Sequence, residues 1–281
     1  MSLLINGVSG HLGRRVAELV LERTSDVVLL TRTPEAISGL DAEVRFADFD
    51  DPSSLDAAFV GGTRMLLVSL PVVGARVPQQ KAAIAAAARA GVEHVAYTSI
   101  LNPTPVNASA VAEEHRETEE ALAASGLAWT FLRNSIYADL QPSSAQAALS
   151  SGQLVTNAGE GRTSYVTRED CARVAAEVLL GEGHVDQAYD ITGPEALNAA
   201  DLAALYAEVG GRPVEVLQVD DGAYVAGLVE HAGLPPALAA VYTTFGIATR
   251  EGALSAVTDT VQRLTGRAPG TVREVLAAAL R

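Results

Sequence analysis

Cysteine, positive charge and long apolar runs are scarce in this sequence, and each scarcity excludes a class of protein. Cys171 is the only cysteine among 281 residues, so no disulfide can form within the chain. Its helix-like setting indicates a small buried apolar side chain. No apolar run is long enough to span a bilayer, and the first residues lack the basic start and long apolar core of a secretion signal. The expectation is a soluble cytoplasmic protein with no membrane partner.

Positive charge is also scarce. Acidic residues outnumber basic residues by 34 to 20, which gives a net charge of −14, and no cluster of Lys or Arg stands out. A protein that binds nucleic acid needs a basic face to displace counterions, so nucleic-acid binding is disfavoured. Lys81 is the single lysine, which bears on proton transfer. No spacing of His, Cys and carboxylate residues suggests a metal site.

Strand-like and helix-like stretches alternate through the first half of the chain. The expected strands are 3–6, 27–31, 43–47, 64–69, 94–98 and 128–132, and the expected helices are 11–23, 52–59, 77–90 and 110–125. Such alternation predicts the α/β class, with a doubly wound parallel sheet of the Rossmann type. Ligands bind to such sheets in the crevice beyond the carboxyl ends of the strands.

The pattern loosens after residue 132. Residues 134–165 show no clear period, and the later stretches predict a strand at 188–191 and helices at 168–180, 200–209, 221–232, 237–248 and 271–280. A chain of this length, 48% hydrophobic, suits one large domain with a lobe. We expect residues 1–132 and 166–192 to form the NAD(P)-binding domain. Residues 133–165 and 193–281 would form a smaller, mainly helical substrate lobe.

The most informative motif is a glycine-rich turn that follows the first expected strand and opens a helix. It reads Gly7-Val8-Ser9-Gly10-His11-Leu12-Gly13. Strand, glycine turn and helix is the context in which such a motif indicates dinucleotide binding. Gly7 allows a tight turn, Gly10 lets the backbone approach a pyrophosphate, and Gly13 lets the helix pack close to the strand. The free N–H groups at the helix start then face the phosphates. The alternative is an ordinary strand–helix turn that binds nothing.

The end of the second expected strand bears on the choice of nucleotide. It reads Thr31-Arg32-Thr33, with no acidic residue at its tip. NAD-preferring folds place a carboxylate here, whereas an Arg suits the 2′-phosphate of NADP. NADP(H) is therefore expected over NAD(H). Glu35 lies close by and weakens this preference, and the alternative for Arg32 is a solvated surface residue.

The next two strand ends carry further candidate cofactor contacts. Asp48 is expected to reach the adenine with Phe49 against the ring, and the equal alternative is that Asp48 caps the helix beginning near Pro52. The segment Ser69-Leu70-Pro71 is expected to pass beside the nicotinamide ribose. There Ser69 either hydrogen-bonds to the ribose or only ends the strand.

Together these features resemble the NmrA-like branch of the atypical short-chain dehydrogenase/reductase family. Within that branch the chain is similar to bacterial NAD(P)H:quinone oxidoreductases and triphenylmethane reductases. The resemblance spans nearly the whole chain and rests on the glycine turn, Arg32 and the blocks at 115–119, 125–130, 132–137, 167–172, 181–184, 189–193 and 264–267. It implies that Asn134, Ser135 and Tyr137 line the nicotinamide and substrate pocket. The family often has Gly where this chain has Ser135. For Tyr137, the alternative is an aromatic that only packs against the lobe.

The single lysine limits the chemistry. Most relatives in this superfamily use Tyr-x-x-x-Lys, but Val77 stands four residues before Lys81, so the pair cannot form. Hydride transfer to a quinone or another conjugated acceptor tolerates this loss, because the resulting anion is stabilised and solvent can protonate it. The protein then mainly orients the acceptor. His115 is the candidate proton donor, since its unperturbed pKa lies near neutrality. The alternative is a helix residue paired with Glu119.

The sequence therefore predicts an NADPH-dependent reductase of a quinone or other conjugated small molecule. Its catalytic candidates are His115 and Tyr137, and no metal is expected. Two alternatives stay open: a non-catalytic NAD(P)-binding redox sensor that regulates a partner, as some NmrA-like proteins are, and a biosynthetic reductase of one specialised metabolite. The alanine-rich helix at 81–90 packs either on its own sheet or against a second copy in a homodimer.

Overall fold

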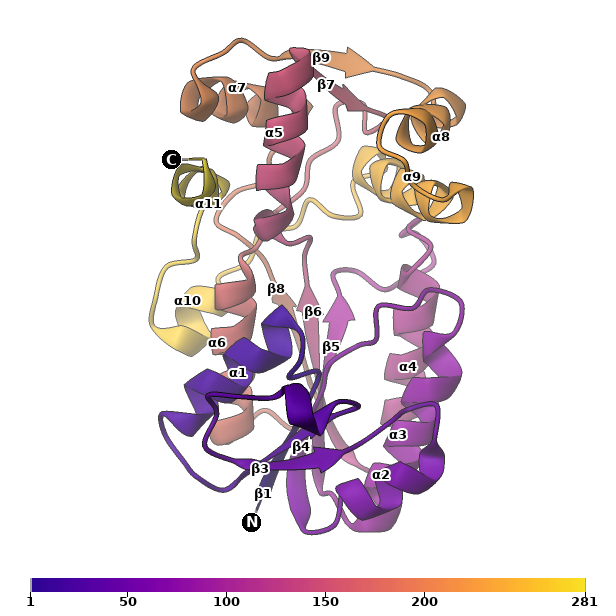
Figure 1. The fold of residues 1–281 in the computed structure, drawn as a ribbon, viewed down its shortest axis with the longest axis vertical. Helices are drawn as coiled ribbons and strands as arrows, with labels where there is room; N and C mark the ends of the chain where they lie inside the picture. The colour runs from indigo at the N-terminus through magenta and orange to yellow at the C-terminus, as the bar shows by residue number, and fades with distance from the viewer. Residues whose placement is uncertain (1, 281) are drawn as a thin grey trace.

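A seven-stranded parallel sheet forms the centre of the computed structural model, which describes residues 2–280 (Figure 1). The strands are β1 (Ser2–Asn6), β2 (Val27–Thr31), β3 (Glu43–Phe46), β4 (Gly62–Leu67), β5 (His94–Ile100), β6 (Ala128–Asn134) and β8 (Gln187–Ile191). Their order in the sheet is β3-β2-β1-β4-β5-β6-β8, so the winding reverses between β1 and β4. Leu4 of β1 stands opposite Val28 of β2 and Met65 of β4. The expected doubly wound Rossmann-type fold is confirmed.

Helices cover both faces of this sheet, and each face has its own apolar core. One face carries α1 (His11–Leu21), α6 (Arg168–Leu180) and α10 (Thr260–Thr265), and the other carries α2 (Pro52–Ala58), α3 (Arg76–Ala90) and α4 (Ala112–Ala123) (Figure 1). Side chains alternate along a strand, so Leu4 and Ile5 of β1 enter opposite cores. This burial on both faces explains why the strands are continuous apolar runs. Cys171 is buried in the first core, as expected.

The alanine-rich part of α3 packs on its own sheet. Ala83, Ala86 and Ala87 are fully buried in the core on that face, together with Ile84. Small side chains let the helix lie close to the strands beneath it. Since this face is used within the chain, a homodimer stays a prediction.

A second group of elements lies beyond the carboxyl ends of the strands (Figure 1). It comprises α5 (Gln141–Ser151), α7 (Ala199–Gly210), α8 (Asp221–Glu230), α9 (Pro236–Arg250), α11 (Val272–Ala279) and a two-stranded parallel sheet of β7 (Gln153–Thr156) and β9 (Glu215–Gln218). Short 3₁₀ turns lie at Pro34–Ala36 and Ala138–Leu140. The expected domain boundaries stay a prediction.

Between residues 2 and 280, no helix combines the length and the apolar character that crossing a membrane requires.

One partly buried ion pair ties α4 to the sheet. Arg133 of β6 donates two hydrogen bonds to the carboxylate of Glu119, at 3.0 and 2.7 Å. Glu119 is only 6% exposed. Its hydrogen bonds raise the pKa of the Arg133 guanidinium, against the lowering effect of burial. Glu119 therefore does not pair with His115, and the alternative that joined those two residues is wrong.

Replacing Glu119 with Gln is expected to lower the free energy of unfolding by about 1–3 kcal/mol, because Arg133 then keeps its charge without a carboxylate partner. The matched control is Glu120→Gln on the same helix. Glu120 is exposed and pairs with Arg116, so its loss should cost less than about 0.5 kcal/mol. Urea unfolding at neutral pH measures both. Equal small losses would show that the buried pair does not stabilise the fold.

Candidate active site

The glycine turn joins β1 to α1 at the point where the winding of the sheet reverses. Gly7 has a φ of 71°, in the left-handed region that favours glycine. A Cβ on Gly13 would lie 2.4 Å from the carbonyl oxygen of Gly7, so only glycine lets α1 begin this close to β1. No side chain caps the start of α1 at Gly10. The first amides of the helix are therefore available to an anion.

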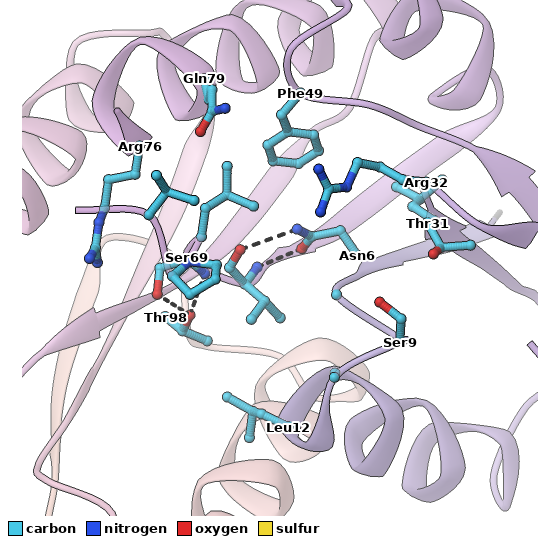
Figure 2. Close-up of a pocket in the computed structure, with 18 of the residues that line it drawn as sticks. Asn6, Ser9, Leu12, Thr31, Arg32, Phe49, Ser69, Arg76, Gln79 and Thr98 are labelled. Carbon is cyan, nitrogen blue, oxygen red and sulfur yellow. Dashed lines mark hydrogen bonds between the residues drawn. The ribbon is translucent and has the colours of Figure 1, made fainter. Parts of the chain in front are cut away.

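Side chains from neighbouring strands hold the end of β4 in place. Asn6 donates from Nδ2 to the carbonyl of Val68 at 3.1 Å, and its Oδ1 accepts from the N–H of the same residue at 2.6 Å (Figure 2). The N–H of Ser69 donates to Oγ1 of Thr98 at 2.8 Å. The backbone after β4 is thus fixed by β1 on one side and β5 on the other.

A cavity of about 520 Å³ runs along this edge of the sheet. Of the residues expected from the sequence, its lining includes Gly7, Ser9, Gly10, His11, Leu12, Gly13, Arg32, Asp48, Phe49, Ser69, Leu70, Pro71 and Tyr137. It also includes residues to which no role was assigned from the sequence, namely Asn6, Leu30, Thr31, Ala47, Asp50, Val68, Val72, Arg76, Gln79, Thr98 and Arg168. The individual roles of all these residues stay predictions. Asn6 and Thr98 are polar residues at the ends of expected strands, a signal that could have identified them, whereas no local pattern marks Arg76 and Gln79 on α3.

Arg32 follows β2 directly and lines the cavity with an exposed side chain. Glu35 lies in the 3₁₀ turn that follows, and no ion pair joins the two in the part of the chain that the structure describes. The guanidinium is therefore available for a ligand. Its five donors match a phosphate group well.

The loop after β3 corrects one of the alternatives for Asp48. The N-cap of α2 is Asp51, whose carboxylate accepts from the N–H of Ser53 at 3.1 Å. Asp48 instead accepts from the N–H of Asp50 at 3.1 Å and lines the cavity. Asp48 does not cap the helix, and its contact with adenine stays a prediction.

Tyr137 lines the cavity and has a buried neighbour on its hydroxyl. Asn134 donates from Nδ2 to that hydroxyl oxygen at 3.4 Å, and Cζ of Arg168 lies 5.0 Å from the centre of the ring. Burial raises the pKa of the Tyr137 phenol, so it keeps its proton. Asn134 and Ser135 are buried behind the lining, with the hydroxyl of Ser135 3.3 Å from that of Ser164. Their roles and that of Tyr137 stay predictions.

His115 lies outside the lining of the cavity, and its surroundings oppose a role as proton donor. Its Nε2 accepts from Nη1 of Arg76 at 3.2 Å, which places the ring proton on Nδ1, 2.8 Å from the hydroxyl of Tyr97. Burial, and then the charge of Arg76, lowers the pKa of His115 to about 3. A neutral imidazole keeps only its weakly acidic ring N–H, so it is no proton donor near neutral pH. The geometry instead makes His115 a support for Arg76, which lines the cavity and pairs with Glu114 at 3.0 Å.

The low pKa of His115 has a measurable effect on stability. The unfolded chain takes up a proton at this residue near the ordinary pKa of 6.5, whereas the folded protein resists protonation until about pH 3. The stabilisation is present above pH 6.5 and is lost as the pH falls toward 3. Between pH 7 and pH 5 the free energy of unfolding should fall by about 2 kcal/mol from this residue alone.

Urea unfolding of the wild type and of His115→Gln at both pH values separates this residue from other titrating groups. The fall between pH 7 and pH 5 should be about 2 kcal/mol smaller in the variant. An equal fall in both proteins would mean that His115 titrates normally in the folded state.

The proteins to which this chain is similar bind NAD(P)H, which agrees with a nucleotide cavity at this edge of the sheet. Residues 7–182 match the protein family described as NAD(P)H-binding. Quinone oxidoreductase 2 of Escherichia coli K12 is 34% identical over 277 residues, which cover 97% of this chain and 96% of that protein. The crystal structure of an NADPH-dependent quinone oxidoreductase from Escherichia coli with NADPH has a TM-score of 0.95 at 33% identity, covering 99% of this chain and 100% of that one.

The crystal structure of Citrobacter sp. triphenylmethane reductase with NADP(H) is similar as well. Its TM-score is 0.93 at 30% identity, and the match covers 99% of this chain and 100% of that one. These matches extend over the sheet and over the elements beyond it, and they confirm the resemblance seen in the sequence. The chain belongs to the NAD(P)H-binding family, among its NmrA-like oxidoreductases.

Proposed function

We propose that the protein is an NADPH-dependent reductase of quinones or similarly conjugated small molecules. The observation that carries the proposal is one cavity whose lining includes the glycine turn, an arginine after β2 with no ion pair among the described residues, and the partly buried phenol of Tyr137, but no ammonium group. The similarity to a quinone oxidoreductase and a triphenylmethane reductase supports the same reading.

Different parts of the lining suit successive groups of NADPH. The uncapped start of α1, with its close approach at Gly13, suits the pyrophosphate. Arg32 suits the 2′-phosphate of the adenosine ribose. The clamped backbone at Ser69 suits the nicotinamide ribose. When bound, the reduced nicotinamide supplies the hydride.

The chain offers no lysine-activated tyrosine at this site. Lys81 is half-exposed on α3, where it pairs with Glu117 of α4 at 3.4 Å, and it does not line the cavity. The hydroxyl oxygen of Tyr137 accepts from Asn134, which leaves the phenol O–H to donate to an acceptor oxygen. A neutral phenol of raised pKa polarises a carbonyl by hydrogen bonding and keeps its own proton. This arrangement suits hydride transfer to a conjugated acceptor. The product is a stabilised anion, which solvent then protonates.

Turnover is tested by following NADPH oxidation with a panel of quinones, with NADH run in parallel. The expected result is quinone-dependent oxidation that is faster with NADPH at equal concentration. NADPH binding without turnover on any member of the panel would contradict the proposal, and it would favour a redox sensor or a reductase narrowly specific for one metabolite.

Replacing Arg32 with Glu tests the nucleotide preference. Two or more charge-assisted hydrogen bonds to the 2′-phosphate are lost and a repulsion is added, so the Kd of NADPH should rise about 100-fold. The Kd of NADH should change less than about threefold. Arg23→Glu, an exposed residue after α1 that pairs with Glu177, makes the same charge change outside the lining of the cavity. Equal weakening of both nucleotides in the Arg32 variant would refute the assignment of the 2′-phosphate.

A further inference from the structure

One arginine of the cavity lining is almost completely buried. Arg76 is the first residue of α3, and only 6% of its side chain is exposed. It nevertheless lines the cavity. Taking a charged group out of water is costly, so a buried guanidinium at the wall of a binding cavity calls for an explanation.

Two residues of α4 hold this guanidinium in one position. Its Nε lies 3.0 Å from Oε2 of Glu114, which is close enough for an ion pair but not aligned as a hydrogen bond. Its Nη1 donates to Nε2 of His115 at 3.2 Å. A guanidinium is planar and rigid, so contacts at two of its nitrogens also fix the place of the third.

The third nitrogen, Nη2, is the free edge of the group. No residue that the structure describes accepts a hydrogen bond from it. It is nevertheless not one of the buried side-chain atoms that lack a partner, whereas Nε of the same residue is. Nη2 therefore keeps accessible surface. Arg76 thus offers the cavity a charged N–H donor that is fixed in place and unused within the protein.

The position of Arg76 indicates which part of the bound molecules it meets. Figure 2 shows its guanidinium on the same side of the view as Ser69 and Thr98, opposite Arg32. The start of α3 is also tied to the loop that follows Ser69, because the N–H of Arg76 donates to the carbonyl of Val72 at 3.1 Å. Ser69 is expected beside the nicotinamide ribose, and Arg32 at the far end of the cofactor. Arg76 thus belongs to the end of the cavity where an acceptor would react.

We propose that Arg76 is a catalytic residue, which donates a hydrogen bond from Nη2 to the acceptor oxygen on which negative charge develops. Addition of the hydride reduces a quinone by two electrons, and a carbonyl π pair moves onto oxygen to give an oxyanion, which solvent then protonates. A donor fixed in advance at that oxygen lowers the barrier to this step. The assignment rests on the proposed function, and it adds a charged donor to the neutral phenol of Tyr137.

Two acceptors that differ in the charge of their product separate this role from simple support of the fold. A quinone becomes an oxyanion, whereas a cationic triphenylmethane dye takes the hydride on carbon and becomes neutral. In Arg76→Gln the kcat/KM for the quinone should fall about 100-fold, whereas that for the dye should change less than about threefold. Equal losses with both acceptors would overturn the assignment. The matched control is Arg89→Gln, an exposed residue of α3 that pairs with Asp56 outside the lining, which should leave both values unchanged.

A binding measurement makes the same test without turnover. The anion 4-nitrophenolate stands in for the oxyanion, and 4-nitroanisole is its neutral counterpart. Their Kd values are measured at mildly alkaline pH on the protein saturated with NADP⁺. The preference of the wild type for the phenolate should fall at least about tenfold in Arg76→Gln. An unchanged preference would overturn the assignment, whereas failure of the wild type to bind NADP⁺ would instead refute the proposed function.

A double variant removes the effect of Arg76→Gln on folding. Loss of Arg76 leaves the carboxylate of Glu114 without its cation, which destabilises the protein. In Arg76→Gln/Glu114→Gln neither charge remains, and the new amide oxygen can still accept from the N–H of Gly74, as the carboxylate does. The double variant should lose activity with the quinone and keep it with the dye. A double variant that reduces the quinone as fast as the wild type would overturn the assignment.

Discussion

The approach of α1 to β1 at Gly13 is the constraint on which the rest of the site depends. With a Cβ only 2.4 Å from the carbonyl oxygen of Gly7, any other residue would push the helix away from the sheet. The helix buries Val16 and Val20 in the core that it shares with α6, so its distance from β1 is set on two sides. Its open amino end therefore faces the cavity at a fixed place, which gives the phosphates of a dinucleotide a rigid support.

Polar side chains in and next to the cavity lining hold its walls in place through hydrogen bonds. Asn6 and Thr98 fix the backbone after β4, and Gln80 accepts from the N–H of Leu70 at 3.2 Å. Arg76 is held by Glu114 and His115, and the chain turns from β4 into α3 over this buried group. The lining thus keeps its shape through bonds between side chains and backbone, which suits a reaction in which orientation does most of the catalytic work.

The sequence sufficed for the parts of the molecule whose signals are local. Alternating apolar runs located the seven strands of the sheet to within two residues, and the glycine turn and Arg32 line the cavity together. The missed helix α5 buries only Gln141, Ala145 and Ala148, so it has no apolar stripe to detect. Gln79 lies on α3, and only the adjacency of β1 and β4 brings that helix to the site. The surroundings of His115 oppose its expected role as a proton donor, and the sequence could not show this because the pKa of the imidazole depends on its burial, which no spacing reveals.

Cys171 gives the molecule an internal chemical reporter. The thiol sits on α6 with 1% of its surface exposed, and burial raises its pKa, so the folded state protects it twice from thiol reagents. Reagent reaches it only when α6 lifts from the sheet. The rate of its alkylation therefore measures how often the nucleotide-binding core opens, and a ligand that spans α1 and the strand ends should slow that rate without touching the sulfur.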